Sequence, residues 1–123
     1  MNASFLMSEM TWPEITEALR KTDIVLVPVG ATEEHGTHLP LNNDIFTSFE
    51  ISKRIAERVA SEIPVLVAPP LPFGISPHLM RFAGTLTLTT GTFMSVVKES
   101  LRNLLLTIEN GPSSRAFILS KNS

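Results

Sequence analysis

The sequence contains no cysteine among its 123 residues. That absence excludes a disulfide framework, a thiolate metal site and a cysteine nucleophile. Any metal ion must therefore be bound by His, Asp or Glu side chains. An excess of basic residues is also lacking, since ten basic and twelve acidic residues give a formal net charge of −2. Nucleic acid is therefore not an expected partner, because phosphate binding requires a basic surface.

Long hydrophobic runs are absent as well. The longest, residues 24–29, is far too short to cross a bilayer, and the first residues lack the positive charge of a signal peptide. We therefore expect a cytoplasmic protein with no membrane contact. Hydrophobic residues make up 43% of the chain and charged residues 18%, which is slightly apolar for a soluble monomer. We expect a partner subunit or further chain to cover part of that apolar surface.

The order of apolar and polar segments predicts an α/β fold. Short apolar or alternating runs indicate strands, and apolar residues recurring every three to four positions indicate helices. The expected strands cover residues 24–29, 65–68, 84–88 and 116–119, and the expected helices cover residues 12–21, a segment starting at about 44, and residues 92–109. This alternation favours a three-layer sandwich, with a mostly parallel sheet flanked by helices. Residues 1–123 are predicted to form a single incomplete domain, truncated after the strand near 116–119.

Each expected helix has an apolar face. The first starts with a capping box of Thr11 and Glu14, with Pro13 in its first turn. Either Asn43 or Asp44 is expected to cap the second. The side chains expected to face the core are Trp12, Ile15 and Leu19 in the first helix, Ile45, Phe49, Ala56 and Val59 in the second, and Met94, Val97, Leu101, Leu104, Leu105 and Ile108 in the third.

The polar loop over residues 30–44 carries the candidate metal ligands. Glu33 and His35 are two positions apart, so in an extended segment their side chains point the same way. Asp44 follows nine residues after His35, at the start of the next helix, where it could share the same ion or bridge to a second. One imidazole and two carboxylates suit zinc, manganese or iron better than calcium.

Less specific interpretations fit the same residues. His35 could be an ordinary surface histidine, Glu33 and Glu34 could be solvated charges, and Asp44 could be only a helix cap. On those readings the chain would be an α/β binding module without a metal. The roles of His38 and His78 stay open, although a histidine such as His78 is more often structural or exposed at the surface than a metal ligand.

Two segments resemble known motifs of one enzyme family. Residues 27–44, VPVGATEEHGTHLPLNND, resemble the first motif of the creatininase family, which runs from a hydrophobic strand into G-[ST]-x-E-Q-H-G-P-H-L-P-x-x-x-D. Ala31, Glu34 and Thr37 stand where that motif has another small residue, glutamine and proline. Residues 73–88, FGISPHLMRFAGTLTL, are similar to the family's Y-G-x-S-x-x-H-x-x-F-P-G-T-x-x-L, within which Gly84 and Thr85 are expected to shape the site.

The resemblance implies a function. In the family, the Glu, His and Asp of the first motif bind a centre of two divalent metal ions, and these correspond to Glu33, His35 and Asp44 here. Such a centre activates water to hydrolyse a C–N amide bond in a small molecule such as creatinine or a formamide. Family members form homo-oligomers, so a homo-oligomer is expected for a complete relative. No catalytic residue beyond the ligands is assigned.

One departure from the family limits that expectation. The third family motif, N-G-H-G-G-N or a relative, should follow residues 117–119, whereas the sequence there reads SKNS. The further metal ligands expected in and after that motif are therefore missing, and we expect the chain to be inactive alone. The alternative is a non-catalytic fragment or pseudoenzyme with only a subunit-interaction role.

Overall fold

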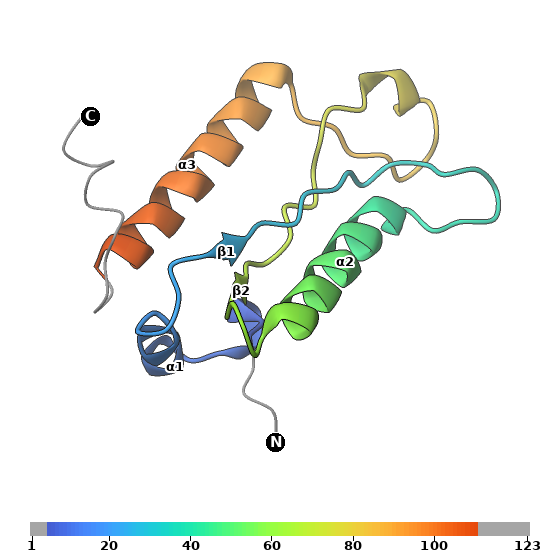
Figure 1. Cartoon of the computed structure of the whole chain (residues 1–123). Coiled ribbons are helices and arrows are strands. Elements are labelled where there is room, and N and C mark those ends of the chain that lie inside the picture. Colours follow the sequence, from blue (N-terminus) through green and yellow to red (C-terminus); the bar gives the residue numbers. More distant parts are fainter. Residues whose placement is uncertain (1–4, 111–123) are drawn as a thin grey trace.

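The computed structural model describes residues 5–110 and confirms an α/β fold (Figure 1). The elements are a 3₁₀ turn η1 (Met7–Glu9), helix α1 (Trp12–Ala18), strand β1 (Val25–Leu26), helix α2 (Asn43–Val59), strand β2 (Leu66–Val67), a second 3₁₀ turn η2 (Pro77–Leu79) and helix α3 (Thr90–Glu109). The strand expected over residues 116–119 lies outside the described residues. Within the described part, no helix is both long and apolar enough to span a membrane.

The two strands pair in parallel, as the sequence predicts. Val25 lies opposite Leu66, and Leu26 lies opposite Val67. An isolated bridge between Val29 and Leu71 continues the pairing beyond both strands, and Leu6 bridges in parallel to Val67 of β2. The connection between β1 and β2 runs through the loop over residues 30–42 and through α2. The candidate ligands therefore lie where the chain leaves the carboxyl end of β1.

The core has two clusters, one on each face of the sheet. Leu66 packs with Leu19 and with Ile108 of α3 on one face, whereas Val65 and Val67 pack with Ala56 of α2 on the other. Neighbouring residues of a strand point to opposite faces, so the alternation along β2 explains both clusters. Full burial of each such side chain stabilises the fold by roughly 1.5–3 kcal/mol. The helices α2 and α3 lie on opposite sides of the strands (Figure 1), and the predicted three-layer arrangement is confirmed.

Hydrogen bonds at the N-termini explain where helices α1 and α3 begin. Thr11 Oγ1 accepts a hydrogen bond from the backbone N–H of Glu14, and the Glu14 carboxylate accepts one from the Thr11 N–H, which confirms the capping box. Helix α3 begins two residues before the expected position because Thr89 Oγ1 accepts from the N–H of Thr92. The prediction that Asn43 or Asp44 caps α2 is wrong. The capping position is Asn42, which makes no side-chain cap bond.

The strands are shorter than predicted. The expected strand over residues 24–29 forms a ladder only at Val25–Leu26, with Ile24 and Val29 each 43% exposed. Pro28 has no N–H to donate, and no strand among residues 5–110 pairs with the free edge of β1. The expected strand over residues 84–88 forms only isolated bridges, because it bonds to two different segments.

The predicted helix faces are only partly buried. Along α3, Ile108 is buried, but Met94 is 64% exposed, Leu101 42% and Leu105 40%. Trp12 of α1 is 79% exposed. In the part of the chain that the structure describes, only the C-terminal end of α3 packs into a core cluster. The expected face of α2 is confirmed in part, since Ala56 is buried and Phe49 and Val59 pack in the same cluster, whereas Ile45 lies outside it.

Candidate metal centre

The site is built on a loop whose two ends touch. The chain passes from β1 to Gly30, whose N–H donates to the carbonyl of Leu71 at 3.0 Å. A Cβ atom placed on Gly30 would lie 2.6 Å from the backbone nitrogen of Ile45 and 2.8 Å from the carbonyl carbon of Asp44. Only glycine allows so close an approach of two backbones. This contact holds the first turn of α2, and Asp44 with it, against the end of the strand.

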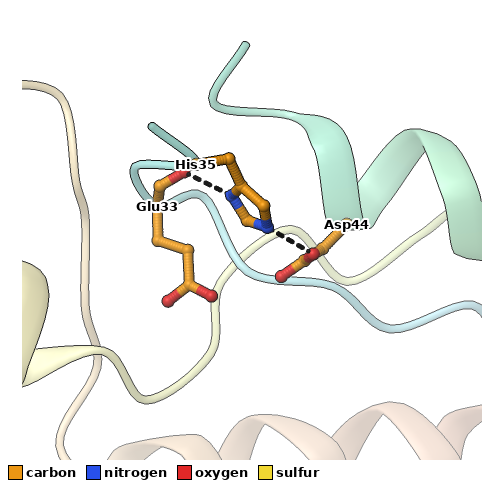
Figure 2. A group of neighbouring side chains, drawn as sticks. All are labelled: Glu33, His35 and Asp44. Carbon is orange, nitrogen blue, oxygen red and sulfur yellow. Dashed lines mark hydrogen bonds and ion pairs between the residues drawn. The ribbon is translucent and has the colours of Figure 1, made fainter. Parts of the chain in front are cut away.

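The structure brings together all three side chains that the sequence singles out. One ligand atom from each of Glu33, His35 and Asp44 lies within 4.8 Å of the other two, and all three residues are half-buried. Figure 2 shows both carboxylates and the far nitrogen of the imidazole ring facing a common space. Three ligand atoms of one tetrahedral ion, each at about 2.0–2.2 Å from it, lie roughly 3.3–3.6 Å from one another. The three side chains would therefore have to move together by on the order of 1 Å to bind a single divalent ion.

Backbone and side-chain hydrogen bonds orient the imidazole of His35. Its Nδ1 lies 3.1 Å from the carbonyl oxygen of Glu33, and its Nε2 lies 2.9 Å from Oδ1 of Asp44. A carbonyl can only accept, so the proton of that first bond is on Nδ1. The bond to Glu33 is the main reason that the pKa of His35 is raised. Partial burial opposes the rise, and the carboxylates of Asp44 and Glu33 add to it.

Such an arrangement is typical of metal-binding histidines, in which one ring nitrogen bonds to a carbonyl and the other faces the ion. Asp44 is not a helix cap. It lies in the first turn of α2, where its negative charge interacts favourably with the helix dipole, and its carboxylate meets the ring of His35.

The remaining polar residues of the loop have other partners. The carboxylate of Glu34 turns back and accepts a hydrogen bond from the N–H of Gly36 at 2.7 Å. Gly36 has a φ of +79°, a left-handed conformation that favours glycine. His38 and His78 are both exposed, and neither belongs to the group of possible metal ligands found among residues 5–110.

Residues 73–88, the second segment that resembles a family motif, form hydrogen bonds to the loop over residues 30–44. Thr85 Oγ1 accepts a hydrogen bond from the backbone N–H of Glu34 at 3.1 Å, and the N–H of Leu86 donates to the carbonyl of Thr32 at 2.9 Å. Thr85 is only 4% exposed. The sequence indicates that Gly84 and Thr85 shape the site but does not reveal the contact with Glu34, which lies 51 residues away along the chain.

A small open hollow lies beside His35. Its volume is about 260 Å³, and its apolar walls come from Leu39 and Leu41 of the loop and from Phe82 and Ala83 of the second segment. This is slightly below the range of pockets that enclose drug-sized ligands, roughly 300–1,000 Å³. A small organic molecule held there would lie next to the imidazole.

Comparisons with known proteins agree with both motifs. The sequence model of the creatininase family, described as creatinine amidohydrolase, matches residues 8–107. The creatinine amidohydrolase of Pseudomonas putida is 34% identical over 110 residues, which cover 85% of this chain and 41% of that protein. The mycofactocin precursor peptide peptidase of Mycobacterium ulcerans (strain Agy99) is 35% identical over 101 residues, covering 78% of this chain and 33% of that protein. The chain thus spans about two fifths or less of these relatives.

Solved structures give the same result. A mutant creatininase of the Zn-Zn type and a manganese form of creatininase each superpose with a TM-score of 0.74 at 32% identity. Each match covers 85% of this chain and 41% of the other. The range that the family model matches, residues 8–107, includes the loop of Glu33, His35 and Asp44.

Proposed function

The chain belongs to the creatininase family, and from that membership we propose that Glu33, His35 and Asp44 bind a divalent metal ion in a metal-dependent amidohydrolase. The observation that carries this proposal is the convergence of the three ligand atoms within 4.8 Å. Zinc and manganese are the proposed metals, since this ligand set suits both and creatininases are known in Zn-Zn and manganese forms. Iron suits the same ligands.

Each of the three residues has a defined part in that proposal. Bound metal would supply a Lewis acid and a water deprotonated near neutral pH for attack on an amide carbonyl. Glu33 and Asp44 provide negative charge that attracts the cation, while His35 presents Nε2 because Nδ1 is held by the carbonyl of Glu33. The hollow beside His35 has room for a small amide, with Leu41 and Phe82 among its apolar walls.

The number of ligands limits what residues 5–110 do alone. A catalytic zinc site usually has about three protein ligands and one open position, and two metal ions need more. The described residues offer three. We infer that they hold one ion, that a complete site contains two, and that this chain by itself does not turn over an amide substrate such as creatinine or a formamide.

Metal analysis of the purified chain tests the proposal. We expect close to one equivalent of zinc or manganese after dialysis, and less than a fifth of that in Glu33→Gln and in Asp44→Asn, which keep the side-chain shape but lose the charge. His78→Gln is the matched control and should keep the full metal content, because His78 is exposed and outside the ligand group. Wild-type chain that folds without metal in the presence of excess zinc and manganese would contradict the proposal.

A second candidate function is subunit interaction without catalysis. The observation favouring it is the exposure of large apolar side chains: Trp12 is 79% exposed, Met94 64% and Phe46 62%. Such surfaces are typical of protein interfaces. Sedimentation of the metal-free chain separates the two candidates, because association that persists in Glu33→Gln and needs no metal favours the interaction role. A cytoplasmic homo-oligomer is compatible with either candidate.

A further inference from the structure

We propose that Thr85 is a positioning residue for the metal centre, acting on His35 through the peptide group that joins Glu33 to Glu34. This inference rests on the proposed metal-binding function. Thr85 forms no hydrogen bond with the side chains of Glu33, His35 or Asp44. Its contact is with the backbone between two of them.

The peptide group between Glu33 and Glu34 is held at both of its polar ends. Its N–H donates to Thr85 Oγ1 at 3.1 Å, and its carbonyl accepts from Nδ1 of His35 at 3.1 Å. A peptide group is planar, so its N–H and C=O turn together. Fixing the N–H against Thr85 therefore fixes the direction of the carbonyl, and the carbonyl fixes both the tautomer and the plane of the imidazole.

Thr85 is buried, and its neighbours in the chain are held against the ligand loop. Thr85 is 4% exposed, and the following N–H, that of Leu86, donates to the carbonyl of Thr32. On its other side Gly84 has a φ of +92°, and a Cβ there would lie 2.5 Å from Cδ1 of Leu41. The segment over residues 84–86 thus contacts both the outgoing and the returning arm of the ligand loop.

Loss of the hydroxyl has a specific consequence. Without an acceptor at Thr85, the N–H of Glu34 is left without this partner in a part-buried position, which favours rotation of the peptide toward water. That rotation turns the Glu33 carbonyl away from Nδ1. The imidazole then loses its orientation while all three metal ligands remain in the chain.

Cobalt(II) binding to the full chain tests this role, because its visible spectrum reports ligand geometry. Thr85→Val keeps the side-chain shape and removes the acceptor, so we expect its cobalt affinity to fall about 10- to 100-fold, the usual effect of losing a group that orients a metal ligand. We expect its spectrum to change as well. Thr85→Ser retains a hydroxyl and should bind within about threefold of wild type with an unchanged spectrum.

Thr87→Val is the matched control. Thr87 lies two residues along the same segment, and its Oγ1 also accepts a backbone N–H, that of Ser76 at 2.7 Å. Thr87→Val should lower the thermal unfolding temperature about as much as Thr85→Val does. It should leave the affinity for cobalt and the cobalt spectrum unchanged. Equal cobalt binding by wild type and Thr85→Val, or equal loss in Thr87→Val, would overturn the positioning role alone.

Two outcomes separate this inference from the function on which it rests. A folded wild-type chain that binds no cobalt, zinc or manganese overturns both. If Thr85→Val does not fold, hydrogen exchange of the Glu34 amide in the wild-type chain decides. Protection of that amide to the level of the α2 backbone supports the role, and exchange as fast as that of an exposed loop amide contradicts it.

Discussion

Nε2 of His35 lies 2.9 Å from Oδ1 of Asp44, although the two residues are nine positions apart in the chain. Since Nδ1 already donates to the carbonyl of Glu33, Nε2 donates to the carboxylate only when the ring carries a second proton. In its doubly protonated form, which the raised pKa of His35 favours, the metal-free ring forms an ion pair with the Asp44 carboxylate. The proton on Nε2 occupies the position that a metal ion would take.

The stability of the metal-free chain should fall as the pH rises. The folded-state pKa of His35 is raised above its ordinary value of 6.5, so its stabilising contribution is complete below that value and is lost as the pH rises through the folded-state pKa. Thermal unfolding in a chelator, from mildly acidic to mildly alkaline pH, measures this loss. His35→Asn should show a flatter dependence. The exposed His78 provides the control, and parallel curves for wild type and His35→Asn would contradict the assignment.

Metal binding should release a proton from His35. At a pH below the folded-state pKa, each ion displaces the proton on Nε2, and well above it the ring has no proton to lose there. Calorimetric titration with zinc in two buffers of different ionisation enthalpy gives the number of protons released. That number should approach one at low pH. As the pH rises through the folded-state pKa of His35, it should decline toward zero while the apparent affinity for zinc increases. A proton count that does not vary with pH would exclude His35 as a ligand through Nε2.

Replacement of Gly30 should disrupt the ligand loop. In Gly30→Ala the new methyl would meet the backbone of Ile45 at 2.6 Å, and a backbone cannot yield as a flexible side chain does. Overpacking of this kind costs about 1–3 kcal/mol, which urea unfolding measures directly. Metal affinity should fall too, because Asp44 must move with Ile45.

Gly91 is the matched control for Gly30. A Cβ at Gly91 meets nothing within 4 Å, and the residue lies in the first turn of α3. Gly91→Ala should therefore leave metal binding unchanged and stabilise the chain by up to about 1 kcal/mol, the helix preference of alanine over glycine. A stability loss in Gly91→Ala as large as that in Gly30→Ala would remove the steric explanation.

The capping box of α1 should be worth a measurable amount. Thr11→Ala removes the hydroxyl that accepts from the N–H of Glu14, at a cost of about 1 kcal/mol in the free energy of unfolding. Thr16→Ala is the comparison within the same helix. The hydroxyl of Thr16 donates to the carbonyl of Trp12, and alanine has the higher helix propensity, so this change should be neutral or slightly stabilising. Equal losses in both variants would mean that the cap is not the cause.

Local sequence patterns predicted the features that depend on local chemistry. The capping box needs only Thr11 and Glu14, and the spacing of Glu33 and His35 places two candidate ligands on one side of an extended segment. The end of β1 and the start of α2 were both visible in the pattern. The convergence of Asp44 with the other two ligands was therefore predictable, although its hydrogen bond to His35 was not.

Burial and hydrogen bonds between distant segments were not predictable in the same way, because both depend on which segment packs against a given surface. The apolar stripe of α3 is real in sequence, yet Met94 is exposed because burial depends on which element covers a helix, not on its periodicity. The alternating segment over residues 84–88 has its threonines facing inward. The hydroxyls of Thr85 and Thr87 bond to loop backbone, and no local signal distinguishes that from an ordinary strand.

The contact between Gly30 and the first turn of α2 has a thermodynamic consequence for metal affinity. In a flexible peptide, closing a loop of roughly 15 residues costs about 2 kcal/mol in chain entropy, in addition to a constant term. An ion bound by an isolated peptide of residues 30–44 would have to offset that cost. In the folded chain, the packing of β2 and α2 has already closed the loop. If Glu33, His35 and Asp44 bind an ion as proposed, the free energy of coordination would therefore appear as affinity for that ion, with little of it used to order the protein.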